Sequence, residues 1–203
     1  DHKRALDNDK GLNTGGMGTF SPSLHYTKEH EAFVREHILQ ATVDAMNNEG
    51  RPFKGVLYFG LMLTPKGVKV LEYNARFGDP ETQVVLPRLQ SDLYEIFEAV
   101  IDGRLAQTEI KWNDKAAVCV VMASGGYPQS YETGFEISGL PVEDALVFHA
   151  GTKLVEGKLV TAGGRVLGVT ALGEDIGQAR EKAYAAVNKI HFKNAHYRRD
   201  IGI

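Results

Sequence analysis

The feature that most constrains the fold is an uninterrupted apolar run, Ala116–Met122, in the second half of the chain. A run of this length without polar alternation is typical of a strand that is buried on both faces. Strand-like segments follow it at 145–150 and 165–172, with a predicted hairpin over 153–161 around Glu156 and Gly157. Apolar residues recur at helical spacing over 175–190. The second half is therefore predicted to form an antiparallel sheet that carries a helix.

Composition and missing motifs exclude several classes of protein. The 203 residues include 23 basic and 26 acidic side chains, a net charge of −3 that argues against a nucleic-acid partner. No apolar stretch is long enough for a membrane helix, and residues 1–20 do not look like a signal peptide, so a cytoplasmic protein that does not bind a membrane is expected. The only cysteine, Cys119, lies inside the apolar run and is predicted to be a buried thiol.

The first half mixes helices and strands. Asp79 and Ser91 are predicted helix N-caps, and Gly103 is a predicted helix stop. The patterns predict a helix over 27–47, a hairpin of strands over 55–64 and 68–74, and helices over 79–89 and 91–102. The polar stretch 104–115 marks a domain boundary. We therefore predict an α+β protein of two domains, residues 1–108 and residues 109–203.

A carboxylate and an amide end the second strand of this hairpin. Strict alternation along the strand would place Glu72 and Asn74 on the same face as Val68 and Val70, with Cα atoms roughly 6.5 Å apart for every two residues. Both side chains offer the hard oxygen ligands that Mg²⁺ prefers, and Arg76 could continue the same face toward a phosphate. The alternative is a strand that leaves the core with solvated polar residues.

Two polar segments near the start of the chain add to this inventory. The glycine-rich loop 13–18 is either a disordered tip or a cradle whose backbone N–H groups converge on an anion. Residues 1–4 (Asp-His-Lys-Arg) are either a solvated terminus or a cationic patch. With Glu72, Asn74 and Arg76, these groups suit the binding of a nucleotide phosphate and a second anionic substrate, and they suggest phosphoryl transfer.

Eight segments together resemble one enzyme family, the glycinamide ribonucleotide synthetases, also called phosphoribosylamine-glycine ligases. They are Asp1–Arg4, Asn13–Gly18, Gly55–Tyr58, Glu72–Gln83, Ala123–Pro128, His149–Thr152, Thr161–Leu167 and Tyr197–Gly202. The resemblance implies an ATP-grasp fold: this chain would hold the second ATP-grasp subdomain, an antiparallel sheet with helices, followed by a small C-terminal domain with an antiparallel sheet and a helix.

The resemblance also implies an activity and its site. The family ligates glycine to 5-phosphoribosylamine with ATP in de novo purine biosynthesis, through glycyl phosphate, and gives glycinamide ribonucleotide, ADP and phosphate. Glu72 and Asn74 match its ligands for Mg²⁺ or Mn²⁺, and Arg76 and Lys3 match catalytic positions. The implied substrate-binding residues are Arg4, Asn13, Thr14, Gly15, Gly16, Asp79 and Glu81.

The chain begins at Asp1 without methionine and has about half the length of the family's members. We therefore expect a fragment whose partner is the missing N-terminal half, and we expect this fragment to be inactive by itself. Two alternatives stay open at this stage. The chain could come from another ATP-grasp carboxylate-amine ligase, or it could be a non-catalytic interaction module.

Overall fold

A computed structural model describes all residues from 1 to 203, and the chain divides into two compact units. Unit 1 comprises Asp1–Pro22, Asp79–Leu89 and Trp112–Ile203, and unit 2 comprises Ser23–Gly78 and Gln90–Lys111. The segments of the two units alternate along the chain, so the two compact units are not separated by a single boundary between residues 108 and 109. The division into two family domains at that point stays a prediction.

Unit 1 is built on a five-stranded antiparallel sheet. Its central strand β6 (Ala116–Ser124) pairs with β10 (Arg165–Gly173) on one side and with β3 (Gly18–Ser21) and β11 (Ala195–His196) on the other. Strand β7 (Leu146–His149) pairs with β10 and completes the sheet. The predicted strand over the apolar run, the antiparallel pairing and the helix after it are all confirmed.

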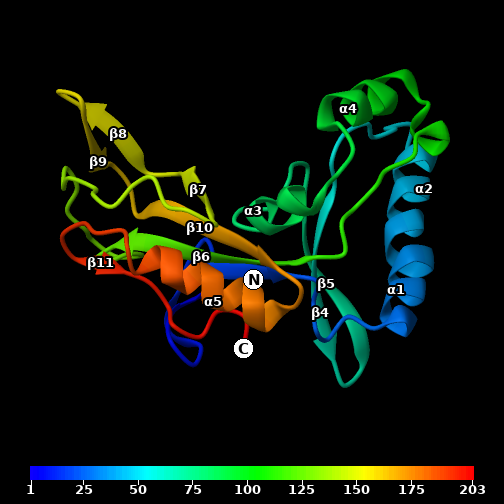
Figure 1. The fold of residues 1–203 in the computed structure, drawn as a ribbon. Coiled ribbons are helices and arrows are strands. Elements are labelled where there is room, and N and C mark those ends of the chain that lie inside the picture. Colours follow the sequence, from blue (N-terminus) through cyan, green and yellow to red (C-terminus); the bar gives the residue numbers. More distant parts are fainter. The chain divides into compact units, whose positions relative to one another are not determined.

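Both faces of β6 are covered, which explains why its sequence does not alternate. Helix α5 (Ile176–Val187), capped by Asp175, contacts β6 and β10 on one face, and α3 (Thr82–Val85) contacts them on the other (Figure 1). Alternate residues point to the two sides: Val118 and Val120 join the cluster under α5, while Ala117 and Cys119 join Val84 of α3. Every residue of the strand is buried.

Two hairpins complete unit 1. Strands β8 (Thr152–Val155) and β9 (Lys158–Thr161) form the hairpin that the sequence predicts at this position. Strand β1 (Arg4–Leu6) pairs with β2 (Lys10–Asn13). Strands β2 and β3 lie on either side of the glycine-rich loop, in a part of the chain for which the sequence patterns predict no strand. Strand β2 is exposed throughout and carries no alternation, and β3 is a strand because it pairs with the distant β6.

Burial gives Cys119 a testable property. Its side chain is fully buried, and this burial raises the pKa of the thiol to about 12. Because thiol reagents attack the thiolate, we expect no labelling of the native chain at pH 8 over the time in which a denatured sample labels completely. The measurement is intact-mass detection of the adduct. Rapid labelling without denaturant would mean that this strand opens readily or is misplaced.

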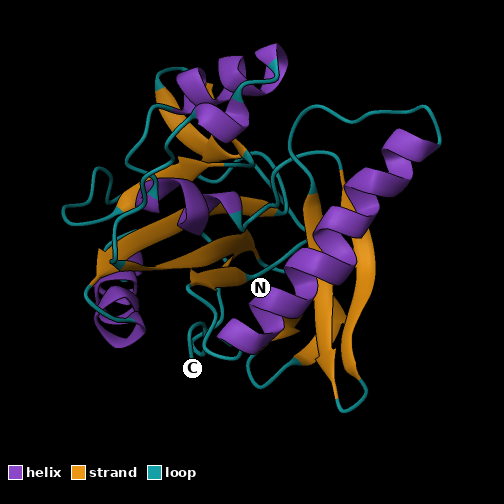
Figure 2. Cartoon of the chain, turned by 90° about the vertical axis from the view of Figure 1, so that its right-hand side faces the viewer, coloured by secondary structure: helices purple, strands orange, loops and turns teal.

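Unit 2 packs a long helix against a two-stranded hairpin. The helix runs through α1 (Lys28–Val34), a π-helical turn (Arg35–Gln40) and α2 (Ala41–Asn48), as predicted. It lies alongside the strands β4 (Tyr58–Thr64) and β5 (Gly67–Asn74), also as predicted (Figure 2). Val34 and Ile38 of the helix and Val68 of β5 form the buried cluster between them.

The remaining helices begin at residues other than those predicted. In unit 2, α4 (Leu93–Asp102) is capped by Asp92, whose carboxylate accepts the Tyr94 N–H at 2.7 Å, and a 3-10 turn (Leu105–Gln107) follows. Ser91, the predicted cap, accepts the Lys111 N–H at 2.8 Å instead. In unit 1, Glu81 rather than Asp79 is the N-cap residue of α3, which continues as a 3-10 turn (Leu86–Arg88). No helix combines the length and the apolar composition that crossing a bilayer requires.

Candidate functional site

A β-bulge in the hairpin of unit 2 changes which side chains share a face. Val70 pairs with Leu61, but Glu72 pairs with Gly60, so Leu71 is an extra residue on β5. Directly opposite residues of an antiparallel pair share a face, and neighbours along a strand alternate. Val70 and Glu72 therefore lie on opposite faces, and the prediction that Glu72 and Asn74 share a face with Val68 and Val70 is wrong.

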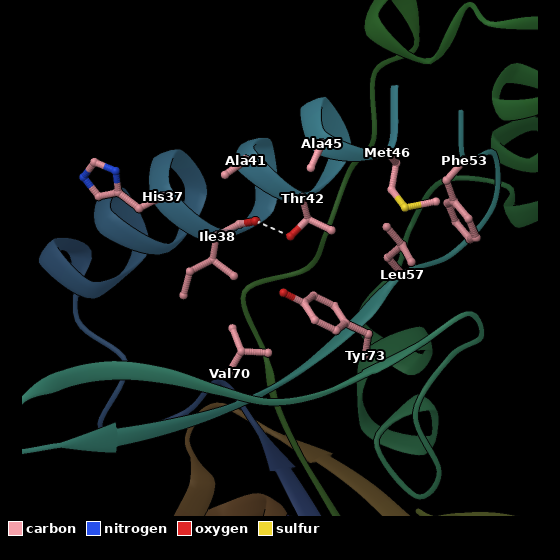
Figure 3. A pocket seen from close by; sticks show the side chains of 10 residues that line it. All are labelled: His37, Ile38, Ala41, Thr42, Ala45, Met46, Phe53, Leu57, Val70 and Tyr73. Atoms are coloured by element: carbon pink, nitrogen blue, oxygen red, sulfur yellow. Dashed lines mark hydrogen bonds between the residues drawn. The ribbon is translucent and has the colours of Figure 1, made fainter. Parts of the chain in front are cut away.

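The side of β5 that faces the helix confirms this geometry. Val70 and Tyr73, three residues apart, both point toward the helix and line an apolar cleft of about 560 Å³ (Figure 3). Ile38 and Thr42 face them from the helix, where the Thr42 hydroxyl donates to the Ile38 carbonyl at 2.6 Å. The cleft holds few polar groups. The candidate metal ligands belong to the other face of the hairpin.

Glu72 and Asn74 do share that other face, opposite Gly60 and Tyr58. A Cβ atom on Gly60 would lie 2.8 Å from Cγ of Glu72, so the glycine leaves the space that the glutamate side chain occupies. The structure gives neither Glu72 nor Asn74 a side-chain hydrogen bond or ion pair. A carboxylate and an amide oxygen with no protein partner, side by side on one face, suit a hard divalent cation.

This pair does not form a complete protein cage for a metal. The structure contains no group of three or more His, Cys, Asp or Glu side chains that could hold a metal ion. Mg²⁺ is commonly bound in proteins by only one or two protein ligands, with phosphate oxygens and water at the other positions. The donor set therefore fits a cation that arrives with a phosphate-bearing substrate.

The alternation predicted that Arg76 would continue this face of the strand. It does not, because β5 ends at Asn74. It lies two residues beyond the strand, and its exposed guanidinium donates to the Phe77 carbonyl at 2.7 Å. Arg76 is therefore close to Glu72 and Asn74 in the sequence, but its side chain donates to the carbonyl of the next residue, Phe77.

The glycine-rich loop in unit 1 is ordered, and its backbone donors are already used. Four successive N–H groups donate within the protein: Thr14 to the Lys3 carbonyl at 2.7 Å, Gly15 to the Tyr127 hydroxyl at 3.0 Å, Gly16 to Oγ1 of Thr14 at 2.9 Å and Met17 to the His2 carbonyl at 2.8 Å. Neither interpretation of this loop is therefore correct. It is not a disordered tip, and these amides do not form an open anion cradle.

The other candidate residues of unit 1 are also engaged. Lys3 forms an ion pair with Asp1, and Arg4 donates to the Gly11 carbonyl at 2.8 Å. Asn13 ends β2 and is exposed, and Glu81 precedes α3. The structure thus brings Lys3, Arg4, the loop, Asp79 and Glu81 into unit 1, while Glu72, Asn74 and Arg76 belong to unit 2.

Arg165 is a contact residue that the sequence patterns did not single out. Its guanidinium donates to the Gly15 carbonyl at 3.0 Å and to the Asp79 carboxylate at 2.9 Å and 3.3 Å. The available signal was an arginine at the start of an otherwise apolar strand, directly after Gly163 and Gly164. Charge at such a position points to a specific partner, but the sequence does not reveal which one.

A buried arginine fastens the first hairpin of unit 1 to the end of the chain. The Arg198 side chain is 1% exposed and forms ion pairs with Asp200 at 2.7 Å and Asp9 at 2.8 Å. It also donates to the Arg4 carbonyl at 3.2 Å. The Arg198 hydrogen bonds hold the pKa of the Asp200 carboxyl well below its usual range. This network fixes the strand that carries Arg4.

The fold defines the class of the protein. It is similar to the biotin carboxylase domain of Hydrogenobacter thermophilus 2-oxoglutarate carboxylase, with a TM-score of 0.64 and 15% identity over 95% of this chain and 42% of that chain. At this identity the likeness shows the fold alone. The chain has the α+β fold of ATP-grasp enzymes, as predicted.

Sequence comparison then identifies the family. The model of the phosphoribosylglycinamide synthetase ATP-grasp (A) domain matches residues 1–82, and the model of the C domain of the same synthetase matches residues 117–203. The chain is 52% identical, over 99% of its length, to a phosphoribosylamine–glycine ligase from Caldanaerobacter subterraneus subsp. tengcongensis. The chain therefore belongs to the phosphoribosylglycinamide synthetase family.

A solved structure agrees with this assignment. The crystal structure of phosphoribosylamine–glycine ligase from Thermotoga maritima matches with a TM-score of 0.88 and 40% identity over 98% of this chain. The chain spans about half the length of its relatives, 48% of the Caldanaerobacter protein and 50% of the Thermotoga chain.

Proposed function

We propose that the chain supplies the metal-binding side of the active site of a phosphoribosylamine-glycine ligase. In the complete enzyme, glycine and 5-phosphoribosylamine are joined at the expense of ATP, through glycyl phosphate, in de novo purine biosynthesis. The products are glycinamide ribonucleotide, ADP and phosphate. The observation that carries this proposal is the pair of unpartnered oxygen ligands, Glu72 and Asn74, which share one face of β5 beyond its bulge. They lie in the segment that matches the ATP-grasp domain model of the family.

Glu72 and Asn74 would hold Mg²⁺ or Mn²⁺ together with oxygens of the ATP phosphates. A divalent cation at such a site supplies charge neutralisation to the phosphoryl group that is transferred. The room that Gly60 leaves lets the Glu72 carboxylate extend from the strand without bending its backbone. Arg76 would exchange its hydrogen bond with the Phe77 carbonyl for the developing negative charge of the phosphoryl group.

In unit 1, Lys3 is proposed as the second catalytic cation, released from its ion pair with Asp1 when an anionic substrate enters. Arg4, Asn13, Thr14, Gly15, Gly16, Asp79 and Glu81 are proposed to bind and orient the substrates. The backbone donors of Thr14, Gly15 and Gly16 are paired within the protein, so this binding would use side chains and carbonyls. The loop would then define the shape of the site without donating hydrogen bonds from these backbone groups to the substrate.

The remaining half of the enzyme is the proposed partner of this chain, and the cytoplasm is its proposed location. Phosphoryl transfer depends on positioning, and a displacement of about 1 Å can cost on the order of 10²-fold in rate. A site without the residues that the rest of the enzyme supplies would lose far more. An acyl phosphate would also meet water in a site that is not closed.

The experiment compares the isolated 203-residue chain with the complete enzyme. Each is incubated with ATP, magnesium, glycine and 5-phosphoribosylamine, and glycinamide ribonucleotide is measured by mass spectrometry. We expect the complete enzyme to form product and the isolated chain, folded by circular dichroism, to form none. Product from the isolated chain at a rate near that of the complete enzyme would show that the catalytic unit is smaller than proposed. No product from the complete enzyme would refute the function.

A further inference from the structure

Arg165 joins two distant parts of unit 1 that both belong to the proposed substrate site. Its Nη1 donates to the Gly15 carbonyl at 3.0 Å and to the Asp79 carbonyl at 3.2 Å, and its Nη2 donates to the Asp79 carboxylate at 2.9 Å. Gly15 and Asp79 lie 150 and 86 residues away from it in the sequence. One guanidinium thus fixes the loop and the segment before α3 with respect to each other.

The arginine of this contact is more buried than the arginine of an exposed ion pair. The Arg165 side chain is 22% exposed, whereas Arg104, which pairs with Asp102 in unit 2, is 47% exposed. The two carboxylates, Asp79 and Asp102, are similarly exposed at 54% and 57%. A Cβ atom on Gly15 would lie 3.0 Å from the Arg165 guanidinium carbon, so the loop approaches the arginine with its backbone. The planar guanidinium places several donors in fixed directions, which an ammonium cannot reproduce.

Tyr127 makes a second contact with the Gly15 loop. The Tyr127 hydroxyl accepts the Gly15 N–H at 3.0 Å, so both polar groups of the Gly15 backbone are held by distant side chains. The Tyr127 ring is set in turn by Gly164, where a Cβ atom would lie 2.3 Å from the ring. Gly164 directly precedes Arg165, so one short segment organises both contacts.

Asp79 has a further constraint. Its Oδ1 accepts the Gln83 side-chain amide at 3.0 Å, and Oε1 of Gln83 is buried without a hydrogen-bond partner. The carboxylate is therefore held between Arg165 and the first turn of α3. Rigid placement of this kind is what a substrate-orienting carboxylate requires.

We propose that Arg165 is a positioning residue of the ligase: it keeps the Gly15 loop and the Asp79 carboxylate in the geometry that orients the substrates. The proposal rests on the function proposed above. Arg165, in the C-terminal part of the chain, would then influence catalysis through Gly15 and Asp79 and would not contact the reacting atoms. Loss of Arg165 should then reduce turnover more than substrate binding.

The first test is independent of activity. Hydrogen exchange of the peptides spanning residues 10–17 is measured in the complete enzyme carrying Arg165→Met. We expect exchange to become at least tenfold faster there, with the amides of β6 unchanged. The matched control is Arg104→Met, which removes an exposed arginine from an ion pair and should leave residues 10–17 as in the wild type. Unchanged exchange in Arg165→Met would overturn the proposal.

The second test separates positioning from binding and from a structural role. For Arg165→Met we expect kcat to fall by about 10²-fold, with KM for each substrate within threefold of wild type and an unchanged content of folded enzyme. Arg165→Lys should not restore kcat, because one ammonium cannot contact both Gly15 and Asp79. A raised KM for one substrate with normal kcat would overturn the proposal in favour of direct binding.

The outcomes also distinguish this proposal from the function on which it rests. If the wild-type complete enzyme forms no glycinamide ribonucleotide, the function fails, while the exchange measurement still reports whether Arg165 holds the loop. If the wild type is active and Arg165→Met keeps its kcat, the function stands and the positioning role is refuted.

Discussion

Replacing Glu72 by glutamine in the complete enzyme is expected to lower kcat by at least about 10²-fold while leaving the thermal melting temperature unchanged. The glutamate is exposed and has no hydrogen bond or ion pair, so it contributes little to the stability of the fold. Glutamine keeps the shape of the side chain and the packing over Gly60 but removes one negative charge from the cation. Steady-state kinetics and differential scanning calorimetry measure the two effects.

Glu98 provides the matched control for this substitution. It is an exposed glutamate on α4 of the same unit, and Glu98→Gln should leave kcat unchanged. Gly60→Ala is a second variant that changes no charge: its Cβ atom would push Glu72 aside and should also lower kcat. Wild-type turnover of Glu72→Gln at saturating magnesium would remove Glu72 from the metal site.

The second large effect concerns stability. Asp200→Asn should lower the free energy of unfolding by about 3 kcal/mol, because it leaves the buried Arg198 charge with only Asp9 as a charged partner. Glu136→Gln is the control within the same unit, since Glu136 and its partner Lys158 are 57% and 64% exposed and ion pairs this exposed add little to stability. Urea denaturation followed by fluorescence of the single tryptophan, Trp112 of unit 1, measures both.

The same carboxylate makes the stability depend on pH. Its pKa in the folded chain lies below the unfolded value of about 3.9, mainly because Arg198 donates hydrogen bonds to the ionised form. The stabilisation is therefore complete above about pH 5 and is lost as the pH falls below the unfolded pKa. We expect a shallower loss of stability below pH 4 in Asp200→Asn than in the wild type. Equal slopes would mean that Asp200 has an ordinary pKa.

Much of the fold could be predicted from local patterns. The doubly buried strand β6, the hairpin of β4 and β5 and the helix over 28–48 follow from runs and periodicities that are complete within each segment. The short strands β2 and β3 could not be predicted in this way. Strand β3 exists because residues about 100 positions away offer it a partner, and nothing in its own four residues indicates that pairing.

The candidate site shows a similar limit. Glu72 and Asn74 do share a face, but the bulge at Leu71 places that face on the side opposite to the one that simple alternation predicts. A bulge is a property of the pair of strands, so one strand's sequence cannot reveal it. Arg165 was missed for a related reason, because its partners, Gly15 and Asp79, lie 150 and 86 residues away from it in the sequence.

Paramagnetic broadening of the chain's amide NMR signals by Mn²⁺ bound to ADP tests directly whether Glu72 and Asn74 hold the metal ion. Broadening decays steeply with distance and detects weak binding, so the isolated 203-residue chain can be used. We expect the signals of Gly60, Glu72 and Asn74 to broaden first, and we expect Glu72→Gln to remove this effect while Glu98→Gln does not. Broadening confined to other acidic surfaces, with these three signals unaffected, would contradict this assignment.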